Sequence, residues 1–362
     1  MFNPTVAQHP SLPRILPVIL LVAICLGSSG CGLFRPSKKV QVPQLLGPLT
    51  EADTPRLVSE VNRLANYKSI HGKVDIEFED TSFAEVGIAE KYKQADGTVT
   101  LQRPGRIYLV ISVPFIAKDI VQMTSDGETF RVAVLEGEEK YKKFLKGTNN
   151  ATYEPLNING DTPTASPQKK RDMTGKETVN ALSNLRPQHL TEALLISPIS
   201  DSTTSNSFFT RSEFYQEEPD TRPNAKKDLR IVKGYYLLEE VSQPVNGNAR
   251  LLRRFWFDRL GGIRLARVQS FDERGGLITD VAYWDEKSLG ETVQRVLPSR
   301  IEITRPRDKY KLRIVYQSPT SVEIDKEYAP EAFVLENRWQ LPEVDLDERL
   351  RSKPASQPNS PR

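Results

Sequence analysis

Side chains that commonly do chemistry are scarce in this sequence of 362 residues. Its cysteines are Cys25 and Cys31, and its histidines are His9, His71 and His189. Isolated histidines make a poor metal site, and two cysteines are too few to form a cysteine-ligated zinc site. The sequence also lacks a phosphate-binding loop, a nucleophile elbow and an HExxH motif. We therefore expect no metal site and no cofactor.

Acidic residues give equally little support to an enzyme. The pairs Glu138-Glu139 and Glu217-Glu218 are adjacent in sequence, and neighbours on a strand face opposite sides of a sheet. His71 at a strand start and Asp126 in a turn are more typical of structural roles. We assign no catalytic residue, although catalytic groups can be assembled from distant strands without a local motif.

Cys31 is the residue whose surroundings indicate a specific modification. It follows Arg14, a wholly apolar run at 15–26 and small residues at 27–30, an order typical of a secretory signal. The apolar run is shorter than the ~20 residues that span a bilayer. Small residues before a cysteine resemble the lipobox of bacterial lipoproteins, although Ser28 stands where an aliphatic residue is usual. That resemblance implies cleavage before Cys31 and attachment of acyl chains such as palmitate; the alternative is an ordinary signal peptide with an incidental cysteine.

Composition narrows the class of protein further. Fifty basic residues nearly balance 47 acidic ones, whereas a nucleic-acid partner requires a clustered basic surplus. Removal of the signal would leave one cysteine and hence no internal disulfide, so stability has to come from an ordinary hydrophobic core.

The periodicity of apolar residues predicts the elements of the body. A helix is expected from residue 54, where proline follows a capping residue, and a helical pair at 177–185 and 187–196. Strands separated by glycine turns follow residue 70, and FDRLGG at 257–262 recurs as FDERGG at 271–276, which marks successive hairpin turns. We divide the chain into a signal (1–30), a tether (31–50), a domain (51–345) with polar insertions near 148–176 and 197–228, and a disordered tail (346–362).

These elements predict a mainly β fold of the α+β class. Parallel strands would each need a helical crossover, so we expect one unclosed antiparallel barrel, or half-barrel, whose helices cap the concave face. Such a sheet would enclose a cavity. Its candidate lining residues alternate with polar neighbours, and they are Val74, Ile76, Phe78, Leu109, Ile111, Tyr310, Leu312, Ile314 and Tyr316.

The order of the elements resembles the LolA/LolB lipoprotein-localisation family. The likeness is carried by LQRPGRI at 101–107, SDGETF at 125–130 and LPSRI at 297–301, and it covers residues 54–334. It implies an unclosed barrel capped by helices whose cavity takes the acyl chains of lipoproteins. Insertions between the meanders make this chain longer than the family pattern.

A lipid anchor makes the chain similar to the receptor branch of that family, in which a loop carries an exposed apolar residue that touches the membrane. The matching residues here are Phe115 and Ile116. A large apolar pair at a loop tip needs a lipid or protein partner, unless both side chains fold onto the core. The residue after Cys31 is Gly32. An aspartate at that position signals retention in the inner membrane, so its absence makes the chain resemble outer-membrane lipoproteins.

Two functions therefore compete. The first is a lipid-anchored outer-membrane protein, facing the periplasm, that binds acyl chains or acylated lipoproteins for lipoprotein localisation or outer-membrane biogenesis. The second is a structural or assembly lipoprotein that docks on another envelope protein through the aromatic residues at 208–215. An enzyme is the least favoured.

Overall fold

The computed structural model describes residues 42–81, 90–91, 95–113, 118–137, 139–151, 153, 185–199, 207–222, 224–226, 228–244, 246–291 and 295–352. Contacts divide the chain into residues 1–44, of which 42–44 are described, and residues 45–362, which form the body. The helices are α2 (Thr54–Ala65), α4 (Pro187–Leu194) and α5 (Leu346–Ser352), with short 3₁₀ helices at Glu139–Tyr141, Pro319–Ser321 and Pro330–Phe333. The strands are β1 (Gln44–Leu45), β2 (Ser69–Asp80), β3 (Glu90–Lys91), β4 (Ala95–Gln102), β5 (Arg106–Val113), β6 (Lys118–Ser125), β7 (Thr129–Val134), β8 (Lys143–Thr148), β9 (Ser207–Pro219), β10 (Arg230–Ser242), β11 (Leu251–Asp258), β12 (Arg264–Phe271), β13 (Leu277–Leu289), β14 (Arg295–Arg305), β15 (Tyr310–Tyr316), β16 (Glu323–Ile324) and β17 (Glu343–Asp345).

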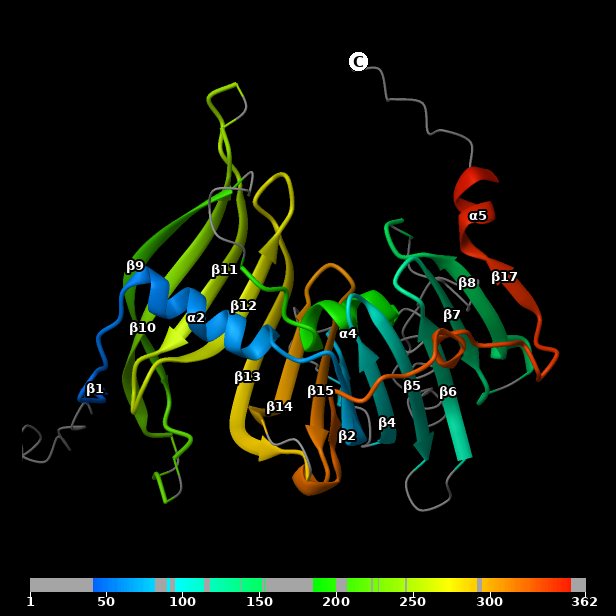
Figure 1. The fold of residues 1–362 in the computed structure, drawn as a ribbon, viewed down its shortest axis with the longest axis horizontal. Helices are drawn as coiled ribbons and strands as arrows, with labels where there is room; N and C mark the ends of the chain where they lie inside the picture. Colours follow the sequence, from blue (N-terminus) through cyan, green and yellow to red (C-terminus); the bar gives the residue numbers. More distant parts are fainter. Residues whose placement is uncertain are drawn as a thin grey trace, which may run out of the picture. The chain divides into compact units, whose positions relative to one another are not determined.

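One continuous sheet is built from two antiparallel meanders. β9 to β15 pair in chain order, and β2, β4, β5, β6, β7 and β8 do the same. The meanders merge because β15 pairs with β2, in the register Ile314↔Ile76. In the described parts of the chain, β9 pairs only with β10, and β17 pairs only with β8, in parallel. The predicted fold class is confirmed: a mainly β, unclosed sheet with α2 and α4 on one face (Figure 1).

Helix α2 is specified by its own sequence. The Asp53 side chain accepts a hydrogen bond of 3.0 Å from the Arg56 amide, and Pro55 occupies the first turn. Leu57, Val61 and Leu64 lie at helical spacing and are buried against the sheet. We call this covered face of the sheet the inner face. No helix among the described residues is both long and apolar enough to cross a membrane.

The repeated FD-x-x-GG segments form two successive hairpin turns, as predicted. Asp258 ends β11 and accepts a 2.8 Å hydrogen bond from the Leu260 amide. One hairpin later, Asp272 accepts hydrogen bonds from the amides of Arg274 at 2.8 Å and Gly276 at 2.7 Å. An aspartate that bonds backbone amides two or more residues ahead closes the turn, and the glycines supply the positive φ.

Strand β9 lies where the sequence analysis placed a polar insertion, at 197–228. It pairs with β10 along its whole length, from Ser207↔Ser242 to Pro219↔Arg230. Apolar and polar residues do not alternate strictly along β9, because it is an edge strand. Phe214 is 40% exposed on the outer face, which is the face opposite the helices, and Tyr215 is 49% exposed. Because this segment is rich in serine, threonine and asparagine, its strand was not predicted from sequence.

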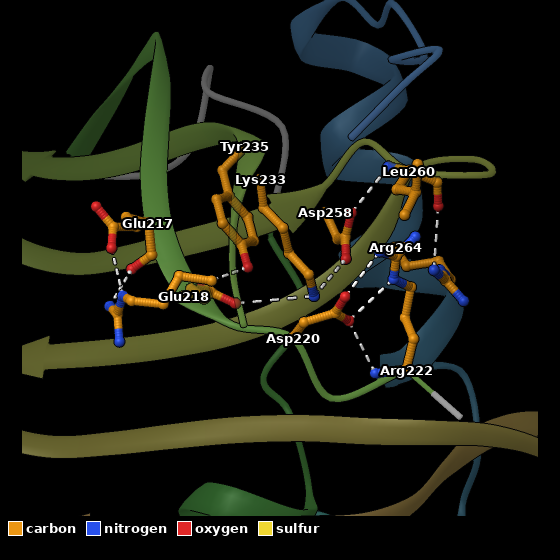
Figure 2. A network of polar contacts seen from close by, with 10 residues as sticks. Glu217, Glu218, Asp220, Arg222, Lys233, Tyr235, Asp258, Leu260 and Arg264 are labelled. Carbon is orange, nitrogen blue, oxygen red and sulfur yellow. Dashed lines mark hydrogen bonds and ion pairs between the residues drawn. The ribbon is translucent and has the colours of Figure 1, made fainter. Parts of the chain in front are cut away.

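A polar network ties β9 to β10 and β11 on the outer face (Figure 2). The Lys233 amine lies 3.8 Å from a Glu218 carboxylate oxygen and 3.5 Å from an Asp258 oxygen, and the Tyr235 hydroxyl donates to Glu218 at 2.7 Å. Glu217 instead pairs with Arg230. The two adjacent glutamates thus have separate partners, and their contacts support the strand edge.

Candidate functional site

The nine candidate lining residues named from sequence are all buried in one cluster with α2 and α4. They come from β2, β5 and β15, where period-two alternation places them on the inner face. Tyr316 lines a small pocket, and the other eight lie in the same core among the described residues. A ligand-contacting role for them stays a prediction.

The pocket beneath the helices has a volume of about 30 Å³. That space has room for roughly two water molecules, whereas an engineered cavity that takes benzene measures about 150 Å³. Side chains of α2 and α4 therefore fill this part of the half-barrel, in place of the open cavity expected from sequence. Its walls are formed by Leu64, Tyr67, Ile70, Leu194, Ile196, Tyr283, Leu297, Pro298, Ile301 and Tyr316.

Buried tyrosines attach the C-terminal end of α4 to this pocket. The Tyr67 hydroxyl donates to the carbonyl of Leu194, and the Tyr283 hydroxyl donates to that of Ala193 at 2.9 Å. Arg103 donates to the Ile196 carbonyl at 3.0 Å. The last carbonyls of a helix have no partner within the helix, so these groups supply one. Because an isolated helix of eight residues is unstable, α4 depends on these contacts.

Two further contacts fix the chain on either side of that end. The Asn62 side chain bonds the backbone of Ile199 twice, donating to its carbonyl at 3.0 Å and accepting from its amide at 2.8 Å. Earlier in α4, Nδ1 of His189 lies 2.7 Å from the Tyr310 hydroxyl. Burial, together with Arg305 and Arg186, lowers the pKa of His189 well below its ordinary value, so this histidine is neutral. Side-chain groups of α2, β13 and β15, together with Tyr67 and Arg103, thus hold α4 and the residues that follow it.

Strong base should unfold the protein cooperatively. Burial raises the pKa of Tyr67 to about 12, and it also raises the pKa of Tyr283, Tyr310 and Tyr316. In the unfolded chain these phenols ionise near a pKa of ~10. The stability that these neutral phenols contribute is complete below that pH. It is lost above that pH by about 1.4 kcal/mol per pH unit for each tyrosine, or roughly 6 kcal/mol per pH unit for four. We expect the last four tyrosinates to appear in the absorbance together with the loss of circular dichroism, after the exposed tyrosines have ionised. Ionisation of all twelve tyrosines before unfolding would contradict this.

Of the remaining residues singled out from sequence, those that the structure describes do not come together as a site. Cys31, Phe115, Ile116 and Glu138 lie outside the described residues. Nδ1 of His71 lies 2.8 Å from Oγ1 of Thr100, within the sheet. Asp126 accepts hydrogen bonds from the amides of Glu128 at 2.9 Å and Thr129 at 2.8 Å, which closes the β6–β7 turn. Among the described residues, no three histidine, cysteine or acidic side chains gather as a metal site would require.

Most of the pocket wall could not be predicted from sequence. Tyr67 lies just after α2, and Tyr283 lies in β13, far away in the sequence. Each is a single aromatic residue with no local motif, and only the folded sheet brings both to the end of α4. The usable signal was the helical spacing of Leu57, Val61 and Leu64, which marks the face of α2 that reaches the pocket.

Comparison with known proteins gives a limited result. No protein family model matches the chain. No curated protein matches it either. Similar solved structures include a LolA superfamily protein from Nitrosomonas europaea, at 10% identity and a TM-score of 0.36 over 79% of this chain and 99% of the other.

Two other solved structures are similar to a comparable degree. A domain assigned to outer membrane lipoprotein sorting, from Vibrio parahaemolyticus, has 8% identity and a TM-score of 0.36 over 77% of this chain and 94% of its own. A DUF1329 family protein from Desulfovibrio piger has 9% identity and a TM-score of 0.33 over 77% and 95%. These neighbours include the superfamily whose resemblance the sequence indicated. At such low identity and TM-score they carry no functional inference.

Proposed function

We propose that this protein binds an acyl chain between the inner face of its half-barrel and helix α4, and that it serves lipoprotein localisation or outer-membrane biogenesis. The observation that carries the proposal is an apolar pocket roofed by a short helix, which side-chain hydrogen bonds hold in place. A segment paired through its backbone to the sheet would be hard to displace, whereas the few side-chain contacts that hold α4 can be exchanged for contacts with a ligand.

The estimated free energies favour reversible binding of an acyl chain. Burying roughly fifteen methylenes contributes about 0.8 kcal/mol each, or ~12 kcal/mol. Displacing α4 forfeits about 1 kcal/mol for each of some four hydrogen bonds. It also exposes Leu190 and Leu194, at roughly 2 kcal/mol each. The surplus of roughly 4 kcal/mol corresponds to a dissociation constant of about 1 mM, weak enough for a carrier to release what it binds.

Binding of a fluorescent fatty acid in solution tests this proposal. We expect residues 31–362 carrying Cys31→Ser to bind the probe saturably with one site per chain, since burial in the half-barrel excludes water from the fluorophore-bearing chain. The same fluorophore without an acyl chain is the control. Absence of saturable binding, or equal binding of both probes, would contradict the proposal.

Membrane attachment is the second part of the proposal. Lipidation of Cys31 would anchor the chain in the outer membrane, facing the periplasm, and Phe115 with Ile116 would contact the same membrane. Two such signals hold a protein on a bilayer far better than one. A full-length Cys31→Ser variant should lose acyl labelling and leave the membrane fraction. Unchanged labelling and fractionation would refute the anchor.

A docking function is the second candidate, and strand β9 favours it. Its outer edge carries no partner strand among the described residues, and Phe208, Phe214 and Tyr215 are exposed along it. An exposed edge with aromatic side chains can pair with a strand of another protein. Photo-crosslinking from position 214 in intact envelopes would favour docking if one protein partner were captured, and acyl binding if none were.

A further inference from the structure

Three arginines are buried among the described residues, and two of them form ion pairs with acidic side chains. Arg259 donates to the carboxylate of Glu213 at 2.9 Å and to the carbonyl of Thr50 at 3.2 Å, and it also pairs with Glu51. Arg305 donates from Nε to Asp308 at 2.7 Å and from Nη1 to the Thr279 hydroxyl at 2.6 Å. Such pairing is what a buried guanidinium ordinarily requires.

Arg186 differs from both. Only 7% of it is exposed, and its guanidinium carbon lies 5.4 Å from the centre of the Phe130 ring and 5.3 Å from that of Tyr153. Its Nη1 atom is buried and has no hydrogen-bond partner in the part of the chain that the structure describes. Stacking on aromatic rings attracts the charge but uses none of the N–H donors. The residue therefore presents an unfilled, charged hydrogen-bond site inside the protein.

The acidic groups near Arg186 are already engaged. Asp308 bonds Arg305, and Asp347 accepts hydrogen bonds from Thr148 and Tyr153. Glu192 lies 4.0 Å from Arg305. Burial lowers the pKa of Arg186, although Tyr153, Asp308 and Tyr310 oppose this effect. Arg186 also precedes the first turn of α4 without capping it, so the partly positive amides of that turn add to the local field.

We propose that Arg186 binds the anionic headgroup, a carboxylate or a phosphate, of the acyl ligand whose chain enters the half-barrel. This inference rests on the proposed acyl-binding function and specifies the polar end of its ligand. Arg186 begins the helix, and Leu194, which lines the apolar pocket, ends it about 12 Å away. One amphipathic molecule can thus place its anion at the start of α4 and its chain under the end.

Paired probes test the headgroup site separately from the chain site. A fluorescent fatty acid and its methyl ester share a chain, but only the acid carries an anion. A charge-assisted hydrogen bond should make the unaltered protein bind the acid at least about tenfold more tightly. Arg186→Gln should abolish that preference. Arg254→Gln is the matched control, because Arg254 also lies over an aromatic ring, Phe271, but is paired with Glu239 on the outer face.

Measurements of thermal stability show whether Arg186→Gln remains folded. Removing an unpaired buried charge should leave the melting temperature of Arg186→Gln equal to that of the unaltered protein, or about 2 °C or more above it. Arg186→Met serves as a second variant that retains the apolar stem. A lysophosphatidate probe distinguishes the two headgroups, since the probe that loses more affinity in Arg186→Gln identifies carboxylate or phosphate.

The outcomes separate the two proposals. Equal affinity of the unaltered protein for acid and ester would overturn the anion site and leave acyl binding intact. If the unaltered protein bound neither probe, acyl binding would be overturned. The anion site would then be tested by the melting temperature in the presence of propionate or inorganic phosphate. A rise in melting temperature with either anion, absent in Arg186→Gln, would support it; no rise would overturn it.

Discussion

The double variant Tyr67→Phe, Tyr283→Phe should bind a fluorescent fatty acid at least about tenfold more tightly than the unaltered protein, although it unfolds more easily. Each substitution leaves a buried carbonyl at the end of α4 without its donor, which costs about 1–3 kcal/mol. That cost falls on the closed state alone, because water satisfies the carbonyls once α4 is displaced. A larger open fraction lowers the apparent dissociation constant in proportion.

Titration of the probe and thermal unfolding, measured together, check this result. Tyr108→Phe is the matched control, because its hydroxyl donates to Gln122 at 3.2 Å and does not contact α4. We expect the control to leave the affinity unchanged. A double variant that is less stable but binds the probe no better than the control would show that α4 does not gate the pocket.

Leu64→Ala should enlarge the pocket and raise the affinity for small apolar ligands. Leu64 lines the pocket and is buried, so truncation should destabilise the protein by about 2–5 kcal/mol and leave a cavity. Leu57→Ala is an unusually close control, since Leu57 lies on the same face of α2 and is equally buried, but it is not part of the pocket wall.

Both variants should therefore lose similar stability, and only Leu64→Ala should gain binding. Denaturant unfolding measures the first quantity, and the shift of the melting temperature in the presence of benzene measures the second. A benzene-dependent shift that is equal in the two variants would mean that the pocket is no better placed for a ligand than the rest of the core.

The strands of the sheet were largely predictable from sequence, but their neighbours were not. Alternation at 74–78 and 310–316 predicted two strands with one buried face, which β2 and β15 confirm. That these two strands pair, with Leu312 opposite Phe78, could not be read from the sequence, because no local turn joins them. Pairing between distant strands depends on the whole sheet, and local periodicity carries no information about it.

The candidate site was less predictable than the fold, for two physical reasons. The hydroxyl groups that hold α4 belong to tyrosines in otherwise ordinary surroundings, so their role arises from tertiary contact alone. β9 was missed because an edge strand with both faces partly wet needs no strict alternation. Residues 346–352, assigned from sequence to the tail, form α5, whose Leu346 is buried in the core.

A photoreactive fatty acid tests the central claim most directly, because it reports where the chain binds. After irradiation and digestion, mass spectrometry locates the adducts, and excess unlabelled fatty acid controls for specificity. We expect competable adducts on α4 and on pocket residues such as Leu64 and Ile301. Competable adducts confined to the exposed aromatics of β9, Phe208, Phe214 and Tyr215, would contradict it.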